Sequence, residues 1–179
     1  NYAHKSLFRL LVLTLFLNLG TWPAYAVDDW VLVERFEDQL GKAKAGDDHA
    51  MYEVGMMYEL GRGTGRDPDQ AAAWLQRAVA KDNNHARARL GGLYYEGKLL
   101  KRDLTKARTL LQTAADANIP SAQFHLAQMY EAGDGVDADA QLALQWYRQA
   151  AKGGYYEARA RIDALNSAAS NTAPKPSVA

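Results

Sequence analysis

Histidines are the first residues in this chain that could hold a metal ion or transfer protons. His49 and His85 are 36 residues apart, which places them on neighbouring helices of a repeat, whereas His125 occupies a different helical face. A zinc site needs further nitrogen, sulfur or carboxylate ligands, and no acidic residue accompanies these histidines at a recognisable ligand spacing. The sequence has no cysteine, which excludes disulfides, thiolate metal sites and cysteine nucleophiles. We therefore predict no metal and no cofactor.

Acidic residues and glycines do not supply an active site either. Asp67, Asp103 and Asp139 stand at one repeated position, where a carboxylate caps the start of a helix. The Gly-rich segment 61–65 resembles a nucleotide loop, but no strand pattern precedes it, and neither a phosphate loop nor a Gly-x-Ser-x-Gly motif occurs. Since catalysis needs a nucleophile, base or metal set held at short range, the sequence predicts a protein that is not an enzyme.

The elements that would position these residues recur along the chain with a period of 36 residues. The positions in register are Ala50, Ala86, Ala122 and Ala158; Tyr58, Tyr94 and Tyr130; Gly61, Gly97 and Gly133; and Ala71, Ala107 and Ala143. A fixed period of this length is typical of a solenoid, whose units bury their apolar faces by stacking on one another.

Each repeat predicts two helices joined by a turn. The first helix has apolar residues at i, i+4, i+7 and i+8, which form one buried stripe, and it ends at the repeated glycine. The second helix begins at the repeated aspartate, and its alanines allow close approach of a neighbouring helix. We therefore predict an all-α fold, a right-handed α/α superhelical solenoid of antiparallel helix pairs. The predicted repeats are 48–83, 84–119 and 120–155.

The segments that flank the repeats predict two caps and a tail. Apolar residues between Trp30 and Ala43 recur at helical spacing, so residues 27–47 are expected to form an N-terminal capping helix. Residues 156–165 repeat the stripe of the first helix and are expected to close the other end as a half-repeat. Residues 166–179 lack large apolar residues apart from one valine and predict a disordered tail.

The first 26 residues have the pattern of a secretory signal. Lys5 and Arg9 precede the apolar run Leu10–Leu19, and Ala24 and Ala26 stand at the two positions that a signal peptidase reads. The alternative is an uncleaved anchor, but the apolar run is shorter than the roughly 20 residues needed to span a bilayer. We expect secretion across the inner membrane of a bacterium into the periplasm, with no stable membrane insertion after cleavage.

Two segments carry a family resemblance. AMYEVGMMYELGRGTGRDPDQAAAWLQRAV and AQFHLAQMYEAGDGVDADAQLALQWYRQAA resemble Sel1-like repeats, which are related to tetratricopeptide repeats. The resemblance implies a superhelical scaffold that binds other proteins, with roles in cell-envelope assemblies such as polysaccharide export, motor or secretion complexes. Some disulfide-rich secreted members have been linked to β-lactam binding or hydrolysis, but this chain lacks their cysteines.

The second repeat departs from the other two in its charge. The whole chain balances 21 basic against 21 acidic residues, which does not indicate nucleic-acid binding. Residues 84–119, however, carry 7 basic and 3 acidic residues, a net charge of +4. The basic residues are Arg87, Arg89, Lys98, Lys101, Arg102, Lys106 and Arg108. They could receive an acidic protein or an anionic polysaccharide, or they could be solvated helix faces that help the repeats to stack.

Surface recognition is the remaining function, and the candidate residues are those that differ between repeats. Leu99 stands where the other repeats have glycine, as an altered turn or a partner contact. The first helices are expected to line a concave face, where aligned positions that turn away from the buried stripe vary. The candidates there are Tyr52, Met56, Arg89, Phe124 and His125, which could bind a protein partner. If so, reversing the charge of Arg89 together with Phe124→Ala should weaken capture without lowering the melting temperature.

Overall fold

The computed structural model describes residues 24–172, with side chains described from residue 30 to residue 168. This part of the chain forms eight helices. They are α2 (Ala24–Lys44), α3 (Asp48–Leu60), α4 (Pro68–Val79), α5 (Asn84–Glu96), α6 (Leu104–Asp116), α7 (Pro120–Ala132), α8 (Ala140–Lys152) and α9 (Glu157–Thr172). Residues 1–23 of the predicted signal lie outside the described residues. Among the helices of residues 24–172, none combines the length and apolar character that crossing a membrane requires.

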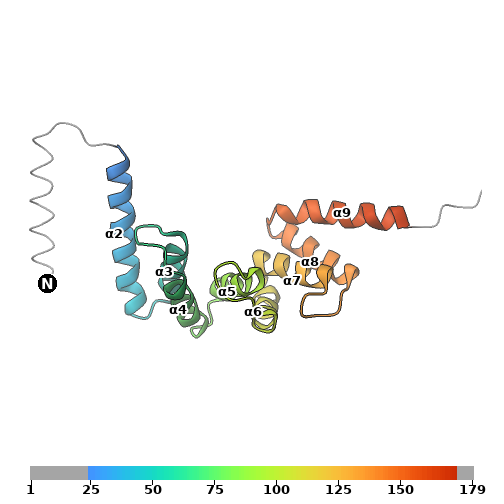
Figure 1. The fold of residues 1–179 in the computed structure, drawn as a ribbon, viewed down its shortest axis with the longest axis horizontal. Coiled ribbons are helices and arrows are strands. Elements are labelled where there is room, and N and C mark those ends of the chain that lie inside the picture. Colours follow the sequence, from blue (N-terminus) through green and yellow to red (C-terminus); the bar gives the residue numbers. More distant parts are fainter. Residues whose placement is uncertain (1–23, 173–179) are drawn as a thin grey trace, which may run out of the picture.

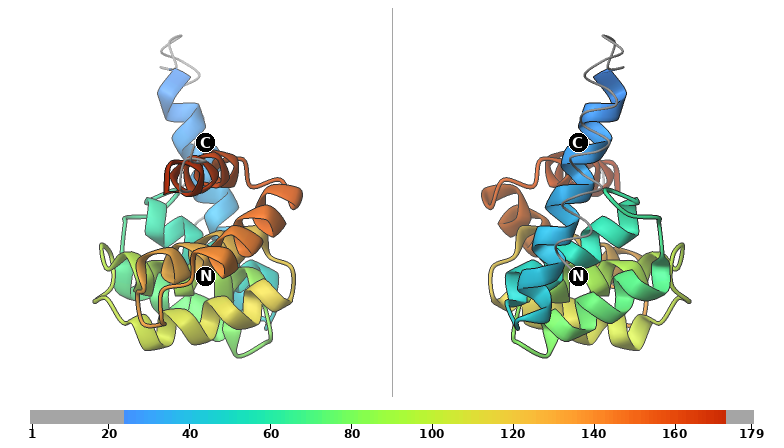
Figure 2. Two further views of the ribbon diagram at one scale, coloured as in Figure 1. Left: turned by 90° about the vertical axis from the view of Figure 1, so that its right-hand side faces the viewer. Right: turned by 90° about the vertical axis from the view of Figure 1, so that its left-hand side faces the viewer.

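The helices form an α/α repeat solenoid, as the sequence predicts. The antiparallel pairs α3/α4, α5/α6 and α7/α8 stack in chain order, and α2 and α9 close the two ends (Figure 1). Figure 2 looks along the long axis from either end and shows the pairs overlapping, with the ends of α2 and α9 rising above them. Three clusters of buried side chains follow one another along the axis, so the core is continuous but distributed.

The capping residues predicted from the sequence begin the helices. The side chains of Asp47 and Asn83 accept hydrogen bonds from backbone N–H groups in the first turns of α3 and α5. Asp67, Asp103 and Asp139 do the same for α4, α6 and α8. These bonds satisfy amides that have no partner inside the helix, which fixes where each helix starts.

Two repeated positions end the helices in the left-handed region. Gly61, Gly97 and Gly133 follow the first helices with φ of 67°, 68° and 74°, which confirms the predicted helix ends. The second position follows the second helices and was not predicted. It is occupied by Gly46, Asp82, Asn118 and Gly154, with φ of 102°, 63°, 61° and 92°. Asp and Asn are the non-glycine residues that best tolerate this conformation, so the turn keeps its shape although its residue type changes.

Leu99 changes the turn between α5 and α6. Gly63 and Gly135 stand at the same position in the other two repeats and have φ of 70° and 71°, whereas φ of Leu99 is not positive. Its side chain is half-buried and packs against the cluster that contains Leu90 and Leu93. The altered turn predicted here is therefore confirmed, and its side chain adds apolar surface to the core.

The two capping helices differ from the predicted ones: α2 spans 24–44 instead of 27–47 and is less buried than predicted, and α9 is longer. Phe36 and Ala43 are 7% and 1% exposed, but Trp30 and Val33 are 48% and 41% exposed, so the predicted apolar face packs only along its second half. In Figure 1 the first turns of α2 extend past α3, which explains this exposure. At the other end, α9 continues through residues 166–172, where a disordered tail was predicted. Residues 173–179 of that tail lie outside the described residues.

Candidate binding surface on the inner helices

All the candidate residues except Leu99 lie on α3, α5 and α7, which form a row with the start of α9 that we call the inner face. Figure 1 shows the chain curving into an arch, with α5 toward the inside of the curve and α6 on its outside. Ring contacts connect successive members of the row: Tyr52 to His85 at 6.1 Å, Tyr95 to His125 at 6.0 Å, and Phe124 to Tyr155 at 4.7 Å. The first helices thus form one continuous surface.

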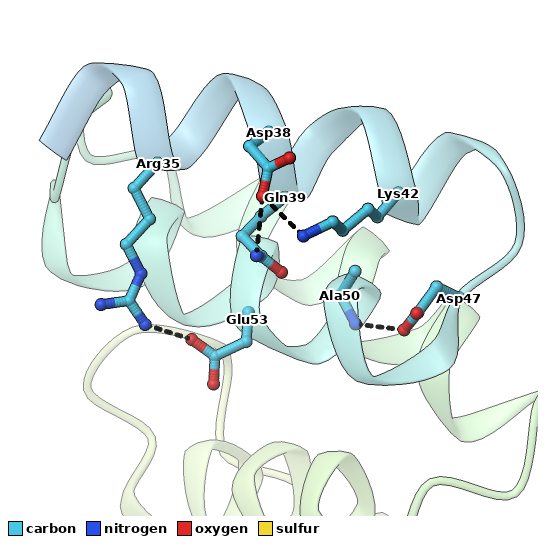
Figure 3. A network of polar contacts seen from close by, with 7 residues as sticks. All are labelled: Arg35, Asp38, Gln39, Lys42, Asp47, Ala50 and Glu53. Carbon is cyan, nitrogen blue, oxygen red and sulfur yellow. Dashed lines mark hydrogen bonds and ion pairs between the residues drawn. The ribbon is translucent and has the colours of Figure 1, made fainter. Parts of the chain in front are cut away.

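Three pairs with the same spacing hold this face together. Glu59 contacts Arg89, Tyr95 contacts His125, and Glu131 contacts Arg161; in each pair the partners are 30 residues apart. In the first pair, Nε of Arg89 donates to Oε2 of Glu59 at 2.7 Å. At the start of the row, Arg35 of α2 takes a similar role, with its guanidinium 3.6 Å from Glu53 (Figure 3).

These pairs explain why the aligned positions vary. Arg89, His125 and Arg161 occupy one repeat position, and each matches a complementary residue on the preceding helix pair. The variation was interpreted from the sequence as partner recognition, whereas here it accompanies contacts between repeats. The signal that could have found them is the constant 30-residue spacing between a Glu and an Arg in two of the three cases.

Arg89 also lies at the centre of the inner face. Burial raises the pKa of Tyr52 and of Tyr155, and it lowers the pKa of His125. The positive charge of Arg89 opposes the rise in the pKa of the two tyrosines and adds to the fall in the pKa of His125. Arg89 lies on α5, between α3 and α7, and adds its positive charge to this face.

Glu131 has a second partner that the sequence did not reveal. The hydroxyl of Tyr147, a residue with no exposed surface, donates to Oε2 of Glu131 at 2.7 Å, and Arg161 donates to the other oxygen. Desolvation acts to raise the pKa of Glu131, but the two hydrogen bonds outweigh it and the pKa is lowered. The carboxylate is therefore held in its charged form between α7, α8 and α9.

Phe124 is not a surface residue, and the expectation that it turns away from the core is wrong. It is 9% exposed and contacts Tyr147 at 5.4 Å as well as Tyr155. Tyr155 covers it from the chain between α8 and α9, a contact that sequence periodicity could not show. Phe124 belongs to the third core cluster, whereas Tyr52 and Met56 keep part of their surface on the inner face.

His125 is held neutral by its surroundings. Its ring packs over α5, where a Cβ added to Gly92 would lie 3.1 Å from Nε2, and its Nδ1 is 3.0 Å from Oε1 of Gln128. Desolvation by burial lowers the pKa of His125, against smaller opposing effects of Gln128 and Glu96. Burial here disfavours the imidazolium.

This pKa predicts a specific loss of stability in acid. Because the pKa of His125 in the folded state is below the ordinary value of 6.5, the unfolded chain binds a proton more readily than the folded one. The contribution of His125 to the free energy of unfolding is therefore present above pH 6.5 and is lost as the pH falls toward the folded-state pKa. The unfolding free energy of the unchanged protein, measured by urea denaturation, should fall between pH 7.5 and pH 5.5. We expect this fall to be smaller in His125→Gln. His85→Gln, at an exposed ring on the same face, is the control and should leave that decrease unchanged.

The basic residues of the second repeat are mostly paired. Five of the seven form ion pairs with acidic side chains. Three of these pairs join neighbouring repeats: Arg87 with Asp82, Arg89 with Glu59, and Arg102 with Asp134. In the part of the chain that the structure describes, no three His, Asp or Glu side chains form a group that could hold a metal ion. His49 and His85 lie on either side of Tyr52, at 6.3 and 6.1 Å between ring centres.

Comparison with known proteins gives the family. Residues 48–83, 84–119 and 120–155 each match the Sel1 repeat, and together they make up more than half of the chain. The chain belongs to the Sel1 repeat family. The boundaries of the three Sel1 repeats agree with the period read from the sequence. A comparison with curated proteins found no match.

Solved structures include several relatives of this Sel1 repeat protein. A Sel1 repeat protein from Oxalobacter formigenes is 35% identical, with a TM-score of 0.61 over 71% of this chain and 96% of that one. The c5321 protein, a protective antigen of uropathogenic Escherichia coli with the same fold, is 34% identical, with a TM-score of 0.62 over 66% of this chain but only 26% of its own length. Cysteine-rich protein B of Helicobacter pylori, at 18% identity over 79% of this chain and 97% of its own, has a TM-score of 0.56 and shares the fold.

Proposed function

We propose that this Sel1 repeat protein is a non-catalytic scaffold that binds a protein segment along its inner face. The observation that carries the proposal is the row of ring contacts that joins Tyr52 to His85, Tyr95 to His125 and Phe124 to Tyr155, on one surface built by successive repeats. Aromatic and Arg side chains contribute most of the binding energy at protein interfaces. Met56 lies on the same helix as Tyr52 and keeps part of its surface exposed.

We further propose that binding takes place in the bacterial periplasm. The apolar run and the small residues before Val27 support export, and a scaffold there needs no metal or cofactor. Mature protein isolated from a periplasmic fraction should begin at Val27, as measured by N-terminal sequencing. Recovery in the cytoplasmic fraction with residues 1–26 intact would contradict this location.

Site-specific photo-crosslinking tests the inner face directly. A benzophenone side chain placed at Met56 should yield a discrete crosslinked product in cells, because this position faces the proposed segment. The control is the same side chain at Arg148, an exposed position on α8 outside the inner row. Products of equal yield at both positions, or products at Arg148 alone, would contradict binding along the inner face.

A further inference from the structure

A cleft opens on the outer side of the solenoid, between the second helices of the first two repeats. It lies between α4 and α6, with α5 as its floor, and has a volume of about 420 Å³. Val79 of α4, Leu90 and Tyr94 of α5, and Leu110 of α6 form its apolar surface, and Lys106 lies at its edge. This cleft is separate from the inner face described above.

The repeat alignment explains why the cleft exists. Leu110 occupies the position of Trp74 in the first repeat and Trp146 in the third. Trp74 is 5% exposed within the first core cluster, and Trp146 packs against both the second and the third cluster. In both outer repeats, therefore, an indole ring fills the space that Leu110 leaves open in the middle one.

The residue on the preceding helix changes together with this position. Val79 is aligned with Ala43 and Ala115, which are each 1% exposed in the same clusters as Trp74 and Trp146. Two interfaces thus combine a small residue with a large ring, and the middle interface combines two aliphatic residues of medium size. A branched aliphatic pair cannot reproduce the flat surface of an indole. The remaining space is lined by the four apolar or aromatic side chains named above together with Gln76, Thr105, Lys106 and Thr109.

The edge of the cleft carries one basic residue, Lys106, which also forms an ion pair with Asp103. Nζ of Lys106 lies 5.1 Å from the ring centre of Tyr94 and 3.3 Å from Oδ2 of Asp103, and the Lys106 side chain is 61% exposed. The surrounding repeat, residues 84–119, carries the net charge of +4. A ligand that enters the cleft therefore meets an apolar floor beneath a cationic edge, which favours an aromatic group next to a carboxylate.

We propose that this cleft binds an aromatic side chain presented by an acidic peptide segment of a partner protein. The aromatic ring takes the place of the indole that the other two repeats supply, and Lys106 receives the neighbouring carboxylate. The site is independent of the inner face, so the failure of one proposal leaves the other standing.

Peptide titration followed by NMR tests the proposal. The probe is acetyl-Glu-Trp-Glu-amide, added to isotope-labelled protein, with acetyl-Lys-Trp-Lys-amide and acetyl-Glu-Ala-Glu-amide as matched controls. We expect saturable shifts of the methyl groups of Val79, Leu90 and Leu110 with a dissociation constant of about 1 mM, as for a single buried side chain. The proposal would be overturned if the Trp peptide does not shift these methyl groups, or if the Ala peptide shifts them as much.

Two variants separate the aromatic and the charged contributions. Val79→Ala with Leu110→Trp reproduces the pair found in both outer interfaces, so it should keep the melting temperature while abolishing the shifts. Lys106→Glu changes an exposed residue and should weaken binding of the acidic Trp peptide about fivefold. The variant should then bind the basic Trp peptide more tightly than the acidic one. Unchanged peptide binding in the double variant would overturn the proposal. The proposal would also be overturned if the wild-type protein sediments as a dimer and the double variant as a monomer, because a second copy of the chain would then fill the cleft.

Discussion

Gly63→Ala is expected to detach α2 from the first repeat and to destabilise the protein by about 3 kcal/mol or more. Gly63 has φ of 70°, where an L-residue is strained. A Cβ at this position would also overlap the carbonyl oxygen of Leu32, and it would lie 2.5 Å from the carbonyl carbon of Leu32 and 3.1 Å from Cβ of Phe36. Since the obstructing atoms belong mainly to helix backbone, they cannot rotate away, and α2 must move.

The measurement is the free energy of unfolding from urea denaturation, together with amide exchange in α2. Exchange should accelerate in α2 while α7 and α8 keep their protection, because the units of a solenoid contact mainly their neighbours. Gly65→Ala is the matched control, since a Cβ there meets no atom within 4 Å. If Gly63→Ala is as stable as Gly65→Ala, the close contact between this turn and α2 is contradicted.

Arg89→Met is the second change with a large expected effect, a loss of about 3 kcal/mol in unfolding free energy. Glu59 is 7% exposed, and its carboxylate receives both hydrogen bonds of the Arg89 guanidinium. Removing Arg89 leaves this carboxylate buried without its partner, which costs far more than the loss of a surface pair. Lys98→Met is the control, because Lys98 is 82% exposed and its pair with Glu96 is long, at 3.8 Å.

This expectation reverses the one drawn from the sequence. There, reversing the charge of Arg89 together with Phe124→Ala was expected to leave the melting temperature unchanged. Both residues make buried contacts, so the combined change should lower the melting temperature sharply and reduce any binding indirectly. Changes at Met56 and His85 are better probes of partner binding, since these side chains keep exposed surface on the inner face.

The periodic features of the fold could be predicted from the sequence because each depends on a few neighbouring residues. Caps such as Asp67 and helix ends such as Gly61 are local, and the 36-residue period reveals them three times. Residues 166–172 were assigned to a tail because they lack large apolar residues, but continuing an established helix costs less than starting one, and alanine favours it.

The inner face could not be predicted to the same extent because it depends on which surfaces of successive helices meet. Arg89 and Glu59 are on different helix pairs, and the twist between repeats decides that they touch. Phe124 is buried where Tyr155, in the chain before α9, folds back over it. Of its two aligned residues, Tyr52 is half-buried and Ala88 is buried. Three of the five candidates that vary between repeats make contacts inside the fold: Arg89 and His125 pair with neighbouring repeats, and Phe124 is buried.

A double-mutant cycle at Glu59 and Arg89 tests the central claim, that variable inner positions are matched in pairs between repeats. Unfolding free energies would be measured for Glu59→Leu, Arg89→Met, the double variant and the unchanged protein. We predict that the double variant recovers most of the stability lost in Arg89→Met, with a coupling of about 2 kcal/mol between the two positions. Additive losses, with the double variant less stable than either single one, would contradict the account.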